Sequence, residues 1–244
     1  MWPVLIAAVI LAQQPQFEAV SIKSAPPDAR GGGYNISPGR ITAKNQTLRD
    51  LVKFAYNLQD FQLTGGPDND HYEIQATYPA ATTAAQRRTM MQSLLTSRFA
   101  LETHRESKEI NGYELIPGKK GPKLKNVDPG EQNTMLGRNS AGLRTLHATS
   151  AGANDLASLL ASLMRCPVEN HTELTGVFDF DLEWSPDDTQ VPVTSKGSPE
   201  QPPPAVDGPS LFNALQDKLG LTLKSRKIQV EVMVIDRFSK PSEN

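Results

Sequence analysis

The fold is decided by residues 41–66, ITAKNQTLRDLVKFAYNLQDFQLTGG, whose pattern returns in residues 143–176, LRTLHATSAGANDLASLLASLMRCPVENHTELTG. Each stretch predicts a short strand, a helix-capping residue, an amphipathic helix and then an extended run. An internal repeat of this length determines an architecture more strongly than any single residue does. We therefore expect two related halves.

The internal repeat continues beyond these stretches. YEIQATYP (72–79) matches FDFDLEWSP (178–186), and both alternate apolar with polar residues, as half-buried strands do. Residues 89–116 then match residues 210–235. The matched positions predicted to be core are Tyr72, Ile74, Ala76 and Tyr78 against Phe178, Phe180, Leu182 and Trp184. The prediction is an α+β protein of two related halves, each a small mixed sheet with helices on one face, in the order β-α-β-β-α-β-β. The alternative is that any alternating α+β chain aligns loosely with itself.

The segment boundaries follow from the same pattern. We expect a signal peptide over 1–12, a first half over 16–117, a polar linker over 118–139, a second half over 140–236 with a disordered Pro-rich insertion at 185–207, and a tail over 237–244. We expect hairpins over 100–116 and 221–236. Helix caps are predicted at Thr47, Thr83, Ser210 and Gly220.

Composition narrows the class of function. The net charge of −2 gives no bulk electrostatic case for nucleic acid or an anionic membrane. Cys166 is the only cysteine, which excludes an intrachain disulfide. The N-terminal run MWPVLIAAVILA is too short to span a bilayer and reads as a secretory signal, the alternative being a buried strand. A periplasmic or secreted location, with no membrane span after signal removal, is the expectation.

Several blocks resemble an uncharacterised family of secreted proteins that is abundant in soil acidobacteria. They are FEAVSIK (17–23), NQTLRDLVKFAYNL (45–58), MMQSLLTSRFALETHRESKE (90–109), YELI (113–116), GPKL (121–124), ELTGVFDFDLEW (173–184) and residues 209–244. The resemblance implies no assigned activity. Some relatives carry such a domain fused to a BlaR-type metallopeptidase, but this chain has no HExxH motif. The strand and helix pattern is also similar to the N-terminal domain of secretins and TonB-dependent receptors, as fold analogy only.

Two groups of charged residues are the best candidates for binding. Lys119, Lys120, Lys123 and Lys125 form the densest basic cluster, which could contact phosphate or an acidic polymer. His104 and Arg105, with Glu106, could form an anion or carboxylate site on a strand. In both cases a solvated surface is the simpler interpretation.

Catalytic and metal-binding patterns are weaker. Asp179, Asp181 and Glu183 alternate on one strand and could act as a carboxylate pair or as calcium ligands. Glu169, His171 and Glu173 alternate and could bind a metal, and Asp68 and Asp70 flank a turn. A polar strand face, a polar loop and a turn explain these three patterns more simply. We expect no catalytic residues, no cofactor and no metal.

The expected function is a non-catalytic binding or interaction module of the bacterial cell envelope. Its partner would be another envelope protein or an extended peptide, because small sheets offer edge strands that can accept one. The alternatives are an envelope-directed hydrolase, using Asp179, Asp181, Glu183, His104 and Glu106, and a ligand sensor related to BlaR-type antibiotic sensors.

Overall fold

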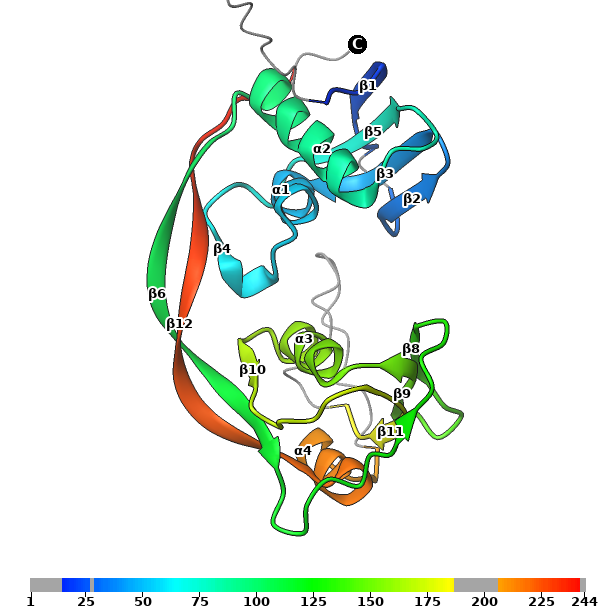
Figure 1. Cartoon of the computed structure of the whole chain (residues 1–244). Coiled ribbons are helices and arrows are strands. Elements are labelled where there is room, and N and C mark those ends of the chain that lie inside the picture. The colour runs from blue at the N-terminus through cyan, green and yellow to red at the C-terminus, as the bar shows by residue number, and fades with distance from the viewer. Residues whose placement is uncertain (1–14, 27–28, 187–205, 242–244) are drawn as a thin grey trace, which may run out of the picture. The chain divides into compact units, whose positions relative to one another are not determined.

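The structure is a computed structural model that describes residues 15–26, 29–186 and 206–241 (Figure 1). The predicted signal peptide and most of the predicted insertion at 185–207 lie outside the described residues. The chain divides into two compact units: Met1–Glu106 with Val232–Asn244, and Ser107–Glu231. The described part contains four α-helices and three four-stranded sheets, so the predicted α+β class is confirmed.

The first unit is built on an antiparallel sheet in the order β1-β5-β3-β2. Its strands are β1 (Ala19–Ser24), β2 (Gly33–Ser37), β3 (Arg40–Thr47) and β5 (His71–Thr77). The helices α1 (Leu48–Tyr56) and α2 (Ala84–Phe99) pack their apolar faces on it, and a short 3-10 turn, Asp60–Gln62, follows α1. The alternating residues Tyr72, Ile74, Ala76 and Tyr78 are all buried, as predicted.

The second unit is built on an antiparallel sheet in the order β7-β11-β9-β8. Its strands are β7 (Asn126–Val127), β8 (Asn133–Arg138), β9 (Arg144–Ala151) and β11 (Val177–Trp184). The helix α3 (Ala153–Met164) and the helix α4 (Leu211–Ala214), which continues as a π-helical turn over Leu215–Leu219, complete the core. Phe178, Phe180, Leu182 and Trp184 are buried, as predicted.

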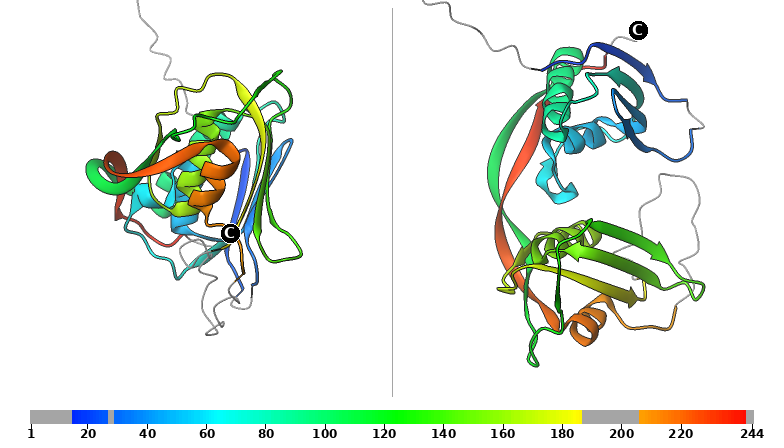
Figure 2. Two further views of the ribbon diagram at one scale, coloured as in Figure 1. Left: turned by 90° about the horizontal axis from the view of Figure 1, so that it is seen from below. Right: turned by 45° about the vertical axis from the view of Figure 1, so that its right-hand side comes forward.

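Two long strands, β6 (Glu102–Pro117) and β12 (Leu221–Arg237), pair with each other and run through both units (Figures 1 and 2). The short strand β4 (Leu63–Thr64) joins β12 in parallel, and β10 (Val168–Asn170) joins β6 in parallel. The two predicted hairpins are therefore wrong. Both strands continue through the predicted turns. Gly112 lies within β6, where the lack of a side chain lets the carbonyl oxygen of Pro167 approach the strand closely.

The stretch 118–139, predicted to be a linker, contains β7 and β8 instead. Both strands pair within the sheet of the second unit, β7 with β11 and β8 with β9. All six residues of β8 are exposed. Because no alternate position of β8 has to be buried, the sequence of this stretch shows no alternation of apolar and polar residues. The predicted tail also changes, because β12 extends to Arg237.

The predicted helix caps are confirmed. Thr47 caps α1 in a reciprocal box: its Oγ1 accepts from the Asp50 amide at 3.1 Å, and the Asp50 carboxylate accepts from the Thr47 amide at 3.1 Å. Thr83 caps α2 in the same way with Gln86, and Ser210 caps α4. Gly220 ends the last helix in the left-handed conformation. No helix in the described residues is long and apolar enough to cross a membrane.

The cap of α1 gives a first testable prediction. Thr47→Ala leaves the Asp50 amide without its acceptor, and loss of an N-cap of this kind costs about 1 kcal/mol in the free energy of unfolding. Urea unfolding followed by circular dichroism measures this change. Thr96→Ala is the matched control, because Thr96 is exposed in the interior of α2, where alanine is at least as good a helix former. Equal losses in the two variants would contradict the assigned cap.

Candidate functional site

The loop that carries the predicted lysine cluster packs on the end of a helix. The Gly118 amide donates to the Gly220 carbonyl at 2.7 Å, and the Lys123 amide donates to the Leu219 carbonyl at 2.8 Å. The Lys123 ammonium donates to the Asp217 backbone carbonyl at 2.6 Å. A positive charge at the C-terminal end of a helix interacts favourably with the helix dipole. Lys123 thus has a structural role. Lys119, Lys120 and Lys125 are exposed, and binding by them stays a prediction.

His104 lies on the β6 and β12 ribbon. Its Nδ1 is 2.8 Å from the Asp236 carboxylate, and both side chains are about half exposed. Arg105 is exposed and lies near Tyr56, whose pKa is raised by burial and held back by the positive charge of Arg105. The structure thus gives His104 a cross-strand partner and places Arg105 on the surface.

The carboxylates of β11 lie beside residues of the neighbouring strand β9. Asp179 accepts a hydrogen bond at 2.8 Å from the amide of Ser150, a residue in the left-handed conformation just before α3. Asp181 is 2.7 Å from the Nδ1 of His147 on the neighbouring strand. Glu183 lies opposite Thr145 on the exposed face. Along a strand, side chains on one face are about 7 Å apart, so these groups form a row and do not converge.

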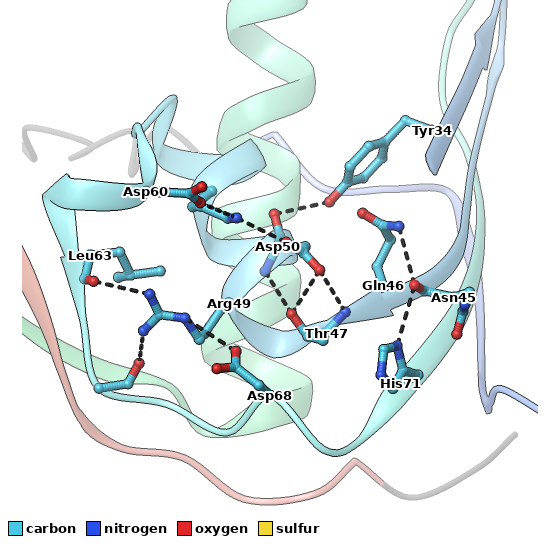
Figure 3. Close-up of polar contacts among 12 residues, drawn as sticks. Tyr34, Asn45, Gln46, Thr47, Arg49, Asp50, Asp60, Leu63, Asp68 and His71 are labelled. Atoms are coloured by element: carbon cyan, nitrogen blue, oxygen red, sulfur yellow. Dashed lines mark hydrogen bonds and ion pairs between the residues drawn. The ribbon is translucent and has the colours of Figure 1, made fainter. Parts of the chain in front are cut away.

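A denser polar cluster surrounds the N-terminal half of α1 (Figure 3). Arg49 donates to the carbonyl oxygens of Leu63 and Gly65 and pairs with Asp68 at 3.2 Å. These bonds attach the loop after α1 to the helix. The same loop contains Asp70, whose carboxylate pairs with Lys240 at 2.8 Å, so both aspartates of the predicted turn have structural partners.

Lys53 bridges two carboxylates in this cluster, Asp60 at 2.6 Å and Asp50 at 2.9 Å. Burial raises the pKa of Asp50, but hydrogen bonds from Lys53 and Thr47 outweigh it and hold the pKa below its ordinary value. Burial lowers the pKa of Lys53, but its bonds to Asp60 and Asp50 outweigh that and raise the pKa. The Lys53 ammonium thus offsets part of the negative charge of the two carboxylates, and the cluster supports the fold by attaching the segment after α1 to the helix.

The remaining reactive residues are also accounted for. His171 lies 3.2 Å from Glu169, two residues away. No group of three or more His, Cys, Asp or Glu side chains in the described part could hold a metal ion. Burial raises the pKa of the Cys166 thiol, which lowers the thiolate fraction needed for nucleophilic chemistry.

One shallow cavity lies in the first unit. Its volume is about 190 Å³, and its apolar lining comes from Phe17, Val20, Met90 and Leu94. Pockets for small molecules usually measure roughly 300–1,000 Å³. None of the candidate residues predicted from the sequence lies in its lining.

The exposed apolar side chains lie mainly on two edge strands. Of the four large exposed apolar residues in the described part, Met135 (61% exposed) and Leu136 (44%) lie on β8, and Ile36 (44%) lies on β2. Both strands are the last in their sheet. Sequence reasoning missed β8 because it fell in the predicted linker. The signal that could have found it is the turn sequence Asn139–Gly142 between β8 and β9. It contains a glycine with positive φ, as does the Pro38–Gly39 turn between β2 and β3.

A comparison with protein families matched residues 49–238 to a family described as a protein of unknown function, DUF3738. The chain belongs to the DUF3738 family. Neither the curated proteins nor the solved structures compared with the chain gave a match. The resemblance predicted from the motifs is confirmed as far as membership of this family of unknown function. The fusion to metallopeptidases and the likeness to secretin domains stay predictions.

The packing of the lysine loop of this DUF3738 protein gives a second prediction. Gly220→Ala strains a left-handed residue and drives a Cβ into the Gly121 carbonyl, so we expect a loss of about 1–3 kcal/mol in the free energy of unfolding. Gly130→Ala is the control, because Gly130 is exposed and a Cβ there meets nothing within 4 Å. Thermal and urea unfolding of the two variants measure the difference. If Gly220→Ala unfolds like the control, the loop does not pack on the helix end as described.

The Asp50 cluster gives a third prediction. A lowered pKa in the folded state means that ionised Asp50 stabilises the fold above its unfolded pKa, and that this contribution is lost as the pH falls through the folded pKa, which lies below 3.8. Asp50→Asn should therefore destabilise the protein more at pH 7 than at strongly acidic pH. Urea unfolding at both pH values measures this, with the exposed Asp128→Asn as control. A loss independent of pH would contradict the role of the ionised carboxylate.

Proposed function

We propose that this DUF3738 protein is a non-catalytic interaction module that works outside the cytoplasm, in the bacterial cell envelope, by accepting an extended strand at a sheet edge. The observation that carries the proposal is that each compact unit exposes an edge strand with a half-exposed apolar residue. Ile36 on β2 and Leu136 on β8 are each 44% exposed. The location rests on the signal-like residues 1–12 and on the resemblance to secreted proteins.

The two edges occupy corresponding places. Ile36 lies opposite Ile41, which lies opposite Ala76, and both of these are buried. Leu136 likewise lies opposite Leu146, which lies opposite Leu182. Directly opposite residues share a face of the sheet, so each edge residue continues a buried core row to the margin of the sheet. A strand added there would cover that row and pair the outward backbone groups of the edge.

We infer that the two units arose by duplication of one module. In support, both follow the order edge strand, strand, helix, short strand, strand, helix, and their sheets read β2-β3-β5-β1 and β8-β9-β11-β7. Left-handed residues stand at matching points, Asn45 and Ser150 before the first helix, and Asn57 and Arg165 after it. Duplication would explain why a binding edge occurs twice.

A hydrolase has less support among the described residues. Its candidate carboxylates Asp179 and Asp181 bond to the Ser150 amide and to His147, and neither belongs to the lining of the cavity described above. A β-edge uses backbone groups for affinity and alternate side chains for specificity, so it needs no convergent set of acids and bases.

Site-specific photo-crosslinking in cells tests the proposal. A photoreactive residue at Ile36 or at Met135 should capture one defined protein, and the captured site should map to consecutive residues of an extended segment. The control position is Glu183, which is exposed but lies on the interior strand β11. Equal capture from all three positions would contradict the proposal. So would turnover of an envelope substrate by the purified protein that a single His104 or Asp181 substitution abolishes.

A further inference from the structure

Among the residues that the structure describes, the strand β8 is a sheet edge that no other strand covers. It has six residues, all exposed, and it pairs with β9 on one side while the order of the sheet ends on the other. Its apolar residues Met135 and Leu136 stand in its middle. Natural proteins protect long edges with charge, proline or brevity, because unpaired backbone groups and apolar side chains recruit another strand.

Other strand margins of the second unit carry such protection. The opposite edge, β7, has two residues, and β10 has three. The portion of β6 and β12 in this unit carries exposed charges in cross-strand pairs, including Glu109 with Lys227 at 2.8 Å. The edge formed by β8 has a single charged residue, Arg138, at its end.

The two faces of β8 have different chemistry. Leu136 extends the buried row of Leu146 and Leu182, each 1% exposed, to the sheet margin. Met135 lies on the other face, opposite His147, which pairs with Asp181. A strand placed beside β8 therefore gains most if it brings a residue that covers Leu136 on one face and an uncharged residue beside Met135 on the other.

We propose that this strand is β8 of a second copy, paired antiparallel about a two-fold axis at Met135. The inference rests on the strand-addition role proposed above, and it assigns the partner at this one edge. The β2 edge, with Ile36, then stays available for a strand of another protein.

Charge at the ends of β8 favours this partner and this direction. Glu131 precedes the strand and Arg138 ends it, and both are exposed. In an antiparallel pair the basic end of each copy meets the acidic start of the other, so the attraction occurs twice. A parallel pair would align Arg138 with its own counterpart. A two-fold interface is also the commonest way in which identical subunits associate.

The register follows from the geometry of the backbone. In an antiparallel pair, opposite residues either both turn their amides inward or both turn them outward, so a two-fold pairing must place one residue opposite itself. With Met135 opposite Met135, Leu136 lies opposite Thr134 on the core face and Arg138 lies opposite Gln132, next to Glu131. With Leu136 opposite itself, Arg138 would lie opposite Thr134, further from Glu131. A centre at Thr134 would place Arg138 opposite Gly130, which also adjoins Glu131, but it would leave Met135 opposite the polar Asn133. Contact between the two Met135 side chains, together with the position of Arg138, therefore favours Met135 as the centre.

Sedimentation velocity over a range of concentrations tests the association with the full chain. The unaltered protein should form a dimer, and Leu136→Lys should abolish it because a charge would enter the interface at both copies. Arg138→Glu should weaken the dimer roughly tenfold, since two attractions become repulsions. The double variant Glu131→Arg/Arg138→Glu should restore it, which a merely misfolded variant would not do. A dimer that is indifferent to these changes, or a chain that stays monomeric, would overturn the proposal.

The register is tested separately with Met135→Cys. Residues opposite each other in an antiparallel pair have Cβ atoms about 4.5–5.5 Å apart, close enough for a disulfide after small adjustment. Mild oxidation should link two copies through residue 135 much faster than through Glu183→Cys on the interior strand. Equal rates would overturn the assigned pairing. A monomer whose edge positions still capture an extended segment of another protein would refute self-pairing and leave the proposed function standing. A dimer whose Ile36 position captures no protein would support self-pairing and contradict a binding edge at β2.

Discussion

The pairing of β6 with β12 is the constraint on which the rest of the structure depends. These strands have 16 and 17 residues, and each passes from one compact unit into the other. The first unit therefore needs Val232–Arg237 from the end of the chain, and β4 has its neighbour only when that segment is present. Since this closure joins residues more than a hundred positions apart, it is costly in chain entropy, and the first unit cannot be complete before the chain is.

The ribbon is held by its backbone ladder more than by its charges. Glu114 pairs with Arg226, and this pairing holds the pKa of the carboxyl below its ordinary value. Lys227 pairs with Glu109, and both side chains are substantially exposed. Exposed pairs of this kind contribute little to stability. These charges also oppose aggregation, because charged side chains along a strand discourage pairing with strands of other molecules.

Local features of the fold could be predicted from the sequence. The alternating rows from Tyr72 to Tyr78 and from Phe178 to Trp184 are buried, because period-two alternation depends only on neighbouring residues. The caps at Thr47 and Gly220 were predicted for the same reason. Long-range pairing could not be read in this way. A sequence pattern predicts a hairpin for each long strand, because continuous strands of 16 and 17 residues are much longer than the usual strand.

The candidate site was less predictable than the fold. The sequence displays a charged residue but not its partner, so His104, Asp181 and Lys123 looked available until the structure placed Asp236, His147 and the Asp217 carbonyl beside them. An edge strand presents the opposite problem. A strand is an edge strand when it pairs with another strand on one side only, and no property of Asn133–Arg138 alone reveals that the sheet ends there.

The two edges also differ in a way that gives them different capacities. On β2, the ring of Tyr34 stacks on Phe54 of α1 at 4.3 Å, and its hydroxyl donates to the Asp50 carbonyl at 3.0 Å. On β8, the corresponding core-facing residue is Thr134, which is exposed. The first edge is thus anchored to its helix and presents little more than Ile36, whereas the second presents apolar side chains on both faces. An edge open on both faces can bury more apolar surface when a strand is added, and apolar burial supplies most of the free energy of association. For this reason β8 is the edge at which two copies can associate, and β2 is suited to a smaller contact.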